Sequence, residues 1–179
     1  ITATLKGELC SEKNYIFNFK KNNKLLSIIN SKKIKEYLKK GVVTPDHVIR
    51  TKPEPLILNI DSCRNSKDLK NYINKEINKF KKNNKNYFKR FSKGRKSTKI
   101  LDSVPQIILI QNLGMFSIGN TLNDAIINGD VSESSINTII RIEERSKFKS
   151  ISKKDIFDVE YWSLEQAKLN KPKKLLTGK

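Results

Sequence analysis

Hydrophobic positions near the start of the chain predict two strands. Aromatic residues occupy every second position from Tyr15 to Phe19, a pattern typical of a strand with one buried face. A polar turn over residues 20–24 leads into the apolar run from Leu25 to Ile29. This run predicts a second strand, antiparallel to the first.

A helix and a loop with many reactive side chains are predicted next. The helix spans residues 32–40, with Ser31 as its cap and Gly41 in the usual C-terminal position. Residues 42–52 carry many reactive side chains bracketed by Pro45 and Pro53, so we interpret them as an ordered loop. Residues 56–60 form a short apolar run that predicts a buried strand.

From Ser66 onward the apolar residues follow the helical period. They recur every three or four positions as far as Phe91, which predicts a long helix with one buried face, followed by a polar loop over residues 92–103. The members of this stripe are Leu69, Tyr72, Ile73, Ile77, Phe80, Tyr87, Phe88 and Phe91.

The last third of the chain predicts a pair of strands and further helices. Residues 106–111 form a buried strand, and residues 115–118 form a second apolar run. Thr121 caps a helix, in which Gly129 is a point of interruption, and residues 155–170 include another short helical segment. Together, these elements predict one α/β domain with a central, largely antiparallel sheet flanked by helices.

The chain is strongly basic. Its 37 Lys and Arg residues against 18 Asp and Glu give a net charge of +19, and 31 of the basic residues are lysine. Lysine, asparagine and isoleucine are the residues that AT-rich codons favour, so the charge alone does not define a function. It does predict non-specific attraction to polyanions at low salt.

Several classes of protein are disfavoured. No apolar run approaches the roughly 20 residues that span a bilayer. The first ten residues do not resemble a secretory signal, and the chain opens without methionine, which suggests a processed product or a piece of a longer protein. Cys10 and Cys63 are too few for a disulfide framework or a zinc motif, so we expect a cytoplasmic location.

Four residues in the predicted loop are candidates for ligand binding. Thr44, His47, Arg50 and Lys52 lie within nine positions of one another. Arg50 and Lys52 are suited to clamp an anionic group, although a solvated charged loop explains them equally well. His47 is the only histidine, and a loop histidine bonded to backbone explains it better than a zinc site or a catalytic triad.

The long helix is also a candidate for nucleic-acid binding. Between Lys67 and Lys99 there are 13 basic residues and only two acidic ones, with aromatic residues interleaved. Those aromatic residues share the face that must be buried, so a core stripe with a solvated basic back is the better interpretation. No phosphate-binding glycine motif is present. Tyr161 and Trp162 are interpreted as anchors of the tail, with a docking surface as the alternative.

Three motifs resemble one known family. They are the run GVVTPDHVIRTKP at 41–53, the Gly114-Met115-Phe116 passage before a helix, and FDVEYWSLE at 157–165. This pattern resembles the bifunctional class II aldolase/short-chain dehydrogenase proteins of the rhamnulose-1-phosphate aldolase/alcohol dehydrogenase type. The resemblance implies a class II aldolase/adducin-like fold and a role in carbohydrate catabolism in the cytoplasm.

The resemblance also implies that this chain is an internal piece of a larger enzyme. Residues 1–170 would be the later half of the aldolase-like region, and residues 171–179 a linker and the first residues of a truncated Rossmann domain. The partners would be the upstream aldolase half and the downstream dehydrogenase domain of the same polypeptide. A homo-oligomer is possible, whereas neither specific nucleic acid nor a membrane is expected.

The family's cofactors are not expected within this segment. The parent would use a divalent metal, usually zinc, held by histidines, and NAD(P) in its dehydrogenase domain. Residues 112–114 resemble the family's Asn-His-Gly element, but Leu113 stands where the metal-binding histidine would be. The resemblance therefore implies a non-catalytic aldolase-like lobe that is structural or supports substrate binding. Basic polyanion or nucleic-acid binding is the alternative.

Overall fold

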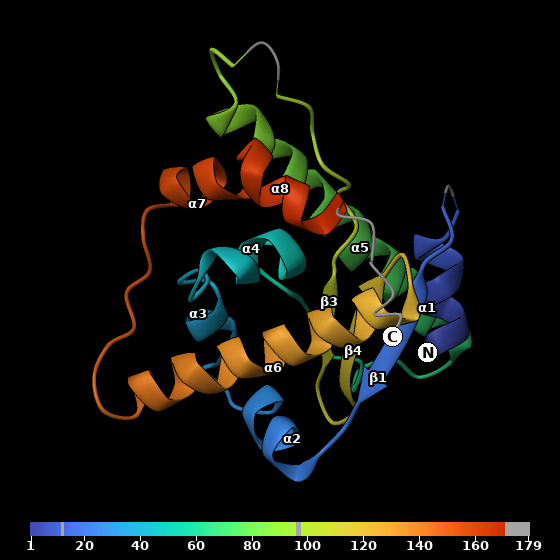
Figure 1. Ribbon diagram of the computed structural model, residues 1–179. Helices are drawn as coiled ribbons and strands as arrows, with labels where there is room; N and C mark the ends of the chain where they lie inside the picture. The colour runs from blue at the N-terminus through green and yellow to red at the C-terminus, as the bar shows by residue number, and fades with distance from the viewer. Residues whose placement is uncertain (12, 96–97, 171–179) are drawn as a thin grey trace, which may run out of the picture.

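A four-stranded sheet lies between two layers of helices in the computed structural model, which describes residues 1–11, 13–95 and 98–170 (Figure 1). The elements are α1 (Thr2–Leu9), β1 (Ile16–Lys20), α2 (Asn23–Ile29), α3 (Ile34–Leu38), α4 (Pro45–Thr51), β2 (Leu56–Leu58), α5 (Ser66–Phe91), β3 (Ile107–Ile110), β4 (Gly114–Gly119), α6 (Leu122–Glu143), α7 (Lys153–Glu160) and α8 (Ser163–Asn170). The predicted α/β class is confirmed.

The sheet has the strand order β1-β4-β3-β2. Strand β4 pairs antiparallel with both β1 and β3, in the registers Phe17 with Ile118 and Ile108 with Phe116. Strand β2 pairs parallel with β3. The sheet is therefore largely antiparallel, as predicted, with one parallel pair because the long helix α5 and its following loop connect β2 to β3.

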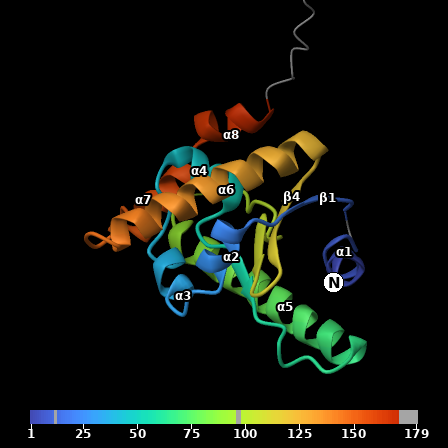
Figure 2. The same ribbon diagram turned by 90° about the horizontal axis from the view of Figure 1, so that it is seen from below.

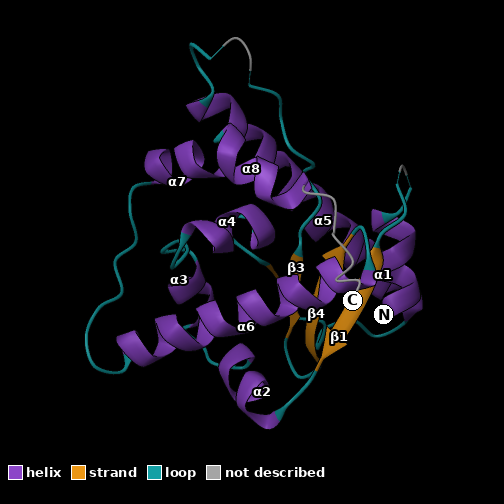
Figure 3. Cartoon of the chain, viewed as in Figure 1, coloured by secondary structure: helices purple, strands orange, loops and turns teal. Residues whose placement is uncertain are grey.

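Strands β3 and β4 are buried on both faces because helices cover the sheet on each side (Figures 2 and 3). Ile108 and Ile110 point into a core shared with α1 and α5, whereas Ile107 and Leu109 point into a core shared with α2, α3 and α6. Successive side chains of a strand face opposite sides of a sheet, which explains this division. A third, smaller apolar cluster joins α4 to α7.

The two long helices begin where the sequence indicates. Thr121 caps α6 by accepting a hydrogen bond from the Asp124 backbone N–H, as predicted. Asn65 caps α5 in the same way through Asp68. Helix α5 runs uninterrupted to Phe91, so the prediction of a long helix is confirmed.

Three local predictions in the first third of the chain are wrong. Residues 25–29 belong to helix α2, not to a strand, because Asn22 accepts a hydrogen bond from the Leu25 N–H and caps a helix there. Residues 45–51 form helix α4, not a loop, with Pro45 in its first turn, where a proline is tolerated. Helix α3 begins at Ile34 after Lys33, so Ser31 is not its N-cap.

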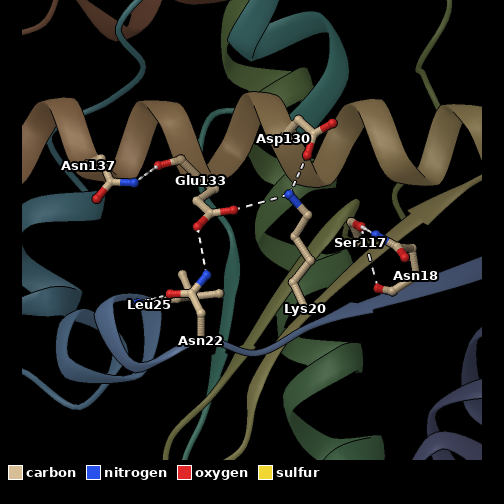
Figure 4. Close-up of polar contacts among 8 residues, drawn as sticks. All are labelled: Asn18, Lys20, Asn22, Leu25, Ser117, Asp130, Glu133 and Asn137. Carbon is tan, nitrogen blue, oxygen red and sulfur yellow. Dashed lines mark hydrogen bonds and ion pairs between the residues drawn. The ribbon is translucent and has the colours of Figure 1, made fainter.

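Gly129 does not interrupt α6. A Cβ at this position would lie 2.7 Å from Ser117 Oγ, so glycine lets the helix pack closely on β4. Asn18 of β1 donates a hydrogen bond to the same Ser117 hydroxyl at 3.4 Å (Figure 4). The glycine is explained by close packing between helix and sheet, which its sequence position did not reveal.

Residues 171–179, the predicted linker and start of a dehydrogenase domain, lie outside the described residues. Among the helices of the described ranges, none combines the length and the apolar character needed to cross a membrane.

Candidate functional site

Thr44 and His47 meet at the start of helix α4. Thr44 is the N-cap residue, but its hydroxyl bonds to His47 Nδ1 at 2.6 Å and does not cap a backbone N–H. Burial lowers the pKa of His47, and the nearby Asp46 carboxylate and Val131 carbonyl only partly oppose this effect. His47 is therefore neutral at physiological pH.

Arg50 and Lys52 stand at the other end of α4. Arg50 is half-buried, whereas the Lys52 side chain is only 6% exposed. Lys52 is also the C-cap residue, with φ 64° and ψ 170°, a backbone conformation that is almost confined to glycine. The structure thus joins Thr44 to His47 and places Lys52 in a different environment, so a shared ligand site for all four stays a prediction.

Lys52 forms part of the wall of a cavity of about 600 Å³. Four parts of the chain enclose this cavity: the end of α3, the segment from Lys52 to β2, one side of α5, and α7. Its size falls within the range of small-molecule pockets. The lining residues are Lys35, Leu38, Lys39, Lys40, Gly41, Lys52, Pro53, Glu54, Pro55, Leu56, Ile57, Glu76, Lys79, Phe80, Asn83, Asn84, Asn86, Tyr87, Lys153 and Ile156.

The lining of this cavity, named here the lysine cavity, is strongly positive. Six lysines and two glutamates give it a formal charge of 6 − 2 = +4. Glu54 pairs with Lys153 at 3.2 Å, and Glu76 lies 4.0 Å from Lys79. Lys52 has no hydrogen-bond or ion-pair partner for its ammonium group among the described residues. Lys40 pairs with Glu143, which lies outside the lining, at 2.7 Å. The positive charge that remains on Lys35, Lys39 and Lys52 attracts anions.

The lysine cavity also contains an unsatisfied amide. Asn84 of α5 is 8% exposed, and its Oδ1 has no hydrogen-bond partner within the described residues. Leaving a buried polar group unpaired costs about 1–3 kcal/mol of folding free energy. Asn83 and Asn86 line the same wall, so one side of the cavity is rich in groups that both donate and accept hydrogen bonds.

Lys52 and Glu160 attract each other electrostatically, and the charge of each shifts the pKa of the other. Burial lowers the pKa of Lys52, and the negative charges of Glu160 and Asp102 oppose that shift. Burial raises the pKa of Glu160 to about 7, against the opposing effects of Lys52 and the Tyr87 hydroxyl. Two buried ionisable groups on the wall and beside it are typical of a functional site, although structural networks show the same shifts.

Sequence reasoning missed Asn84 and Glu160. Asn84 occupies a position of the apolar stripe of α5, four residues after Phe80 and seven after Ile77. Glu160 lies between the buried Phe157 and Tyr161 in the last turn of α7. A polar residue at a position that the helical period assigns to the core is the signal that could have found both.

The turn between β3 and β4 does not fit a metal centre. Leu113 packs against the apolar core of the α1 and α5 side. Asn112, in the left-handed conformation, donates a hydrogen bond from Nδ2 to Asp61 at 3.0 Å. Within residues 1–11, 13–95 and 98–170, no group of three His, Cys, Asp or Glu side chains could hold a metal ion.

The aromatic residues of α5 are half-buried, on the face that the core-stripe interpretation assigns to the interior. Tyr87, Phe88 and Phe91 surround Phe157 of α7, with ring centroids 5.4, 6.1 and 5.9 Å away. Tyr161 stacks on Phe157 at 4.3 Å and anchors the tail, whereas Trp162 is 52% exposed. The contacts with Phe157 occupy the rings at the end of this helix, which disfavours the basic-aromatic surface for nucleic acid.

Comparison with known proteins places the chain in a family. Residues 1–169 match the family of the second domain of class II aldolases, and the chain belongs to this family. It is 25% identical over 170 residues to the "Uncharacterized oxidoreductase YuxG" of Bacillus subtilis (strain 168). That match covers 94% of this chain and 24% of the relative, so the chain spans about a quarter of the length of the curated relative. No solved structure matches the chain.

Proposed function

We propose that this chain is a non-catalytic, supporting domain of a bifunctional sugar-phosphate aldolase and NAD(P)-dependent short-chain dehydrogenase. The whole enzyme would cleave a rhamnose-type sugar phosphate to dihydroxyacetone phosphate and an aldehyde, and would oxidise or reduce a small carbonyl product. It would act in the cytoplasm. The upstream aldolase half would supply the zinc ligands, and the downstream domain would bind NAD(P).

The position of Leu113 carries this proposal. At the point where the family resemblance calls for a metal-binding histidine, the chain has a leucine that packs into the apolar core. Leucine cannot coordinate a metal, and the only histidine of the chain, His47, is bonded to Thr44 on a different element. The domain match over residues 1–169 and the oxidoreductase name of the longer relative support the rest.

Two preparations test this proposal: the full natural polypeptide that contains the chain, and the 179-residue chain alone. We would measure zinc by mass spectrometry, cleavage of rhamnulose 1-phosphate, and NAD(P)H-linked turnover of the aldehyde product. We expect zinc and both activities in the full polypeptide, and none of them in the 179-residue chain. Cleavage by the chain alone would overturn its non-catalytic role. A full polypeptide without either activity would overturn the bifunctional assignment.

A variant of the turn tests the structural role of Leu113. Leu113→Ala removes apolar contacts from the core, so we expect the full polypeptide to unfold at a lower temperature. We expect its zinc content to stay the same, because Leu113 holds no metal. Loss of zinc without a change in melting temperature would show that the turn belongs to the metal site after all. Leu164→Ala, at a residue that is 64% exposed, is the matched control.

A further inference from the structure

We propose that the lysine cavity is a binding site for a small organic phosphate that carries hydroxyl groups. The proposal goes beyond the supporting role above, which assigns this domain no ligand of its own. It does not depend on that role, because every residue that forms the cavity is present in this chain.

The phosphate part of the ligand follows from the charges of the wall. The lining carries a formal charge of +4, of which the charge of Lys40 is balanced by Glu143 outside the lining. Lys35 of α3, Lys39 at its C-cap and Lys52 have no ion-pair partner within the described residues. Lysine ammonium groups bind phosphate as point charges, and a dianion gains most from several of them at once.

Lys52 is the central residue of the proposed site. Only 6% of its surface is exposed. Glu160 and Asp102 attract its ammonium group electrostatically but form no ion pair with it. Its backbone is held in a conformation that residues other than glycine rarely adopt. Strained backbone conformations cluster at ligand-binding sites, so the strain at this buried lysine favours a binding role.

The hydroxyl groups of the ligand follow from the asparagine wall. Asn83, Asn84 and Asn86 line one side of the cavity, and the side chains of Asn83 and Asn86 are exposed. Amide groups both donate and accept hydrogen bonds, which suits hydroxyl groups. Leu56 and Phe80 supply an apolar surface for the carbon skeleton. A volume of about 600 Å³ accommodates a molecule of this size but excludes a folded partner.

Isothermal titration calorimetry on the 179-residue chain at 150 mM salt tests the proposal. The probes are glucose 6-phosphate, glycerol 3-phosphate, inorganic phosphate, citrate and glucose. We expect saturable one-to-one binding of at least one organic phosphate, weaker binding of inorganic phosphate, and none of glucose. Equal affinity for inorganic phosphate would contradict the role of the asparagine wall, and equal affinity for citrate would contradict the preference for phosphate. An absence of saturable binding by both organic phosphates would overturn the site.

Charge-matched variants separate this site from general attraction to a basic protein. Lys52→Met removes the buried ammonium, and Lys75→Met removes an exposed ammonium on α5 outside the cavity. We expect Lys52→Met to weaken binding of the organic phosphate more than tenfold and Lys75→Met less than twofold. If both variants weaken binding to the same extent, the attraction is non-specific and the proposal is wrong.

Two further variants keep the test decisive if Lys52→Met does not fold. Lys39→Met changes an exposed residue of the cavity rim, and Asn84→Leu replaces the unpaired amide with an apolar group of similar size. We expect each to weaken binding at least threefold, whereas Asn71→Leu, at an exposed position outside the cavity, leaves affinity unchanged. Unchanged affinity in both cavity variants would overturn the proposal. Because glucose 6-phosphate binding is measured without any aldolase assay, its failure is distinguishable from failure of the bifunctional function.

Discussion

Lys20 Nζ lies 3.1 Å from Glu133 Oε2, and this ion pair fastens the edge strand β1 to helix α6 (Figure 4). The same ammonium group pairs with Asp130, one turn earlier on the helix. Asn22, the cap of α2, donates a hydrogen bond to the other oxygen of Glu133 at 3.0 Å. One carboxylate of α6 thus contacts both β1 and the start of α2, which are more than 90 residues away in the sequence.

Glu133→Gln should destabilise the domain at neutral pH and reduce its sensitivity to acid. The hydrogen bond from Asn22 and the pairing with Lys20 outweigh burial and hold the pKa of Glu133 below its ordinary value of 4.5. The stability it contributes is therefore present above pH 4.5 and is lost as pH falls through the lowered pKa. We expect a loss of about 1 kcal/mol at pH 7 and a smaller difference at pH 3, measured by urea unfolding.

Glu144→Gln is the matched control for this prediction. Glu144 follows α6 at an exposed position and has no ion pair within the described ranges. Its substitution should change the free energy of unfolding by less than about 0.5 kcal/mol. If the two variants behave alike, the pairing of Lys20 with Glu133 does not stabilise the fold.

Gly129→Ala should destabilise the domain even though alanine favours helices. The new Cβ would lie 2.7 Å from Ser117 Oγ, so α6 and β4 would have to move apart. We expect a loss of about 1–3 kcal/mol in thermal or urea unfolding. Adding Ser117→Ala should restore part of it, because the hydroxyl oxygen is the nearest atom.

Gly7→Ala in α1 should stabilise the domain, in contrast to Gly129→Ala. A Cβ there meets no heavy atom within 4 Å, and the position is exposed. The same substitution should therefore stabilise the domain by about 0.4–1 kcal/mol. A destabilising Gly7→Ala, or a neutral Gly129→Ala, would contradict the packing explanation.

The sequence predicts the fold wherever the pattern is long and periodic. The stripe from Leu69 to Phe91 defines α5, and the uninterrupted apolar run from Ile107 to Ile110 defines a strand buried on both faces. Short segments are ambiguous, because five apolar residues fit a strand or a helix equally well. At residues 25–29 the capping hydrogen bond from Asn22 decides in favour of a helix, and hydropathy does not report that bond.

Of the four candidate ligand residues, only Lys52 lines the lysine cavity, and a ligand site shared by all four stays a prediction. The sequence draws attention to Lys52, but it groups that residue with Thr44 and His47, from which the structure separates it. The cavity depends on the end of α3 and on α7, which are distant in the sequence from α5. Pairings of this kind follow from tertiary packing, so a single sequence without a known structure does not reveal them.

Replacing Lys52 with glycine should give a more stable protein than replacing it with alanine. Both variants remove the buried ammonium, so they differ only in the backbone, which has φ 64° and ψ 170° at this position. Alanine is strained in this conformation and glycine is not. We expect the glycine variant to be more stable by about 1–3 kcal/mol in urea unfolding.

At Lys75 the alanine variant should be more stable than the glycine variant, the reverse of the order expected at Lys52. Lys75 lies in the middle of α5 and is exposed, so glycine there costs about 1 kcal/mol relative to alanine. Equal stability of the two Lys52 variants would show that the backbone at the end of α4 is not strained.

Glu160→Gln should stabilise the domain increasingly as pH rises from 5 to 8. Burial raises the pKa of Glu160 from its ordinary 4.5 to about 7, and Lys52 and Tyr87 only partly oppose this effect. A carboxyl with a raised folded-state pKa favours folding fully below pH 4.5, and this contribution is lost as pH rises through 7.

The wild type therefore carries a cost in folding free energy at pH 8 that a neutral glutamine avoids. The difference in unfolding free energy between variant and wild type should grow by about 2 kcal/mol over this range. His47 is present in both proteins, so its contribution cancels in the difference. Glu144→Gln, at an exposed position, is measured in parallel as the control for the substitution itself. A constant difference for Glu160→Gln would mean that the Glu160 carboxyl is ionised in the folded protein throughout this range.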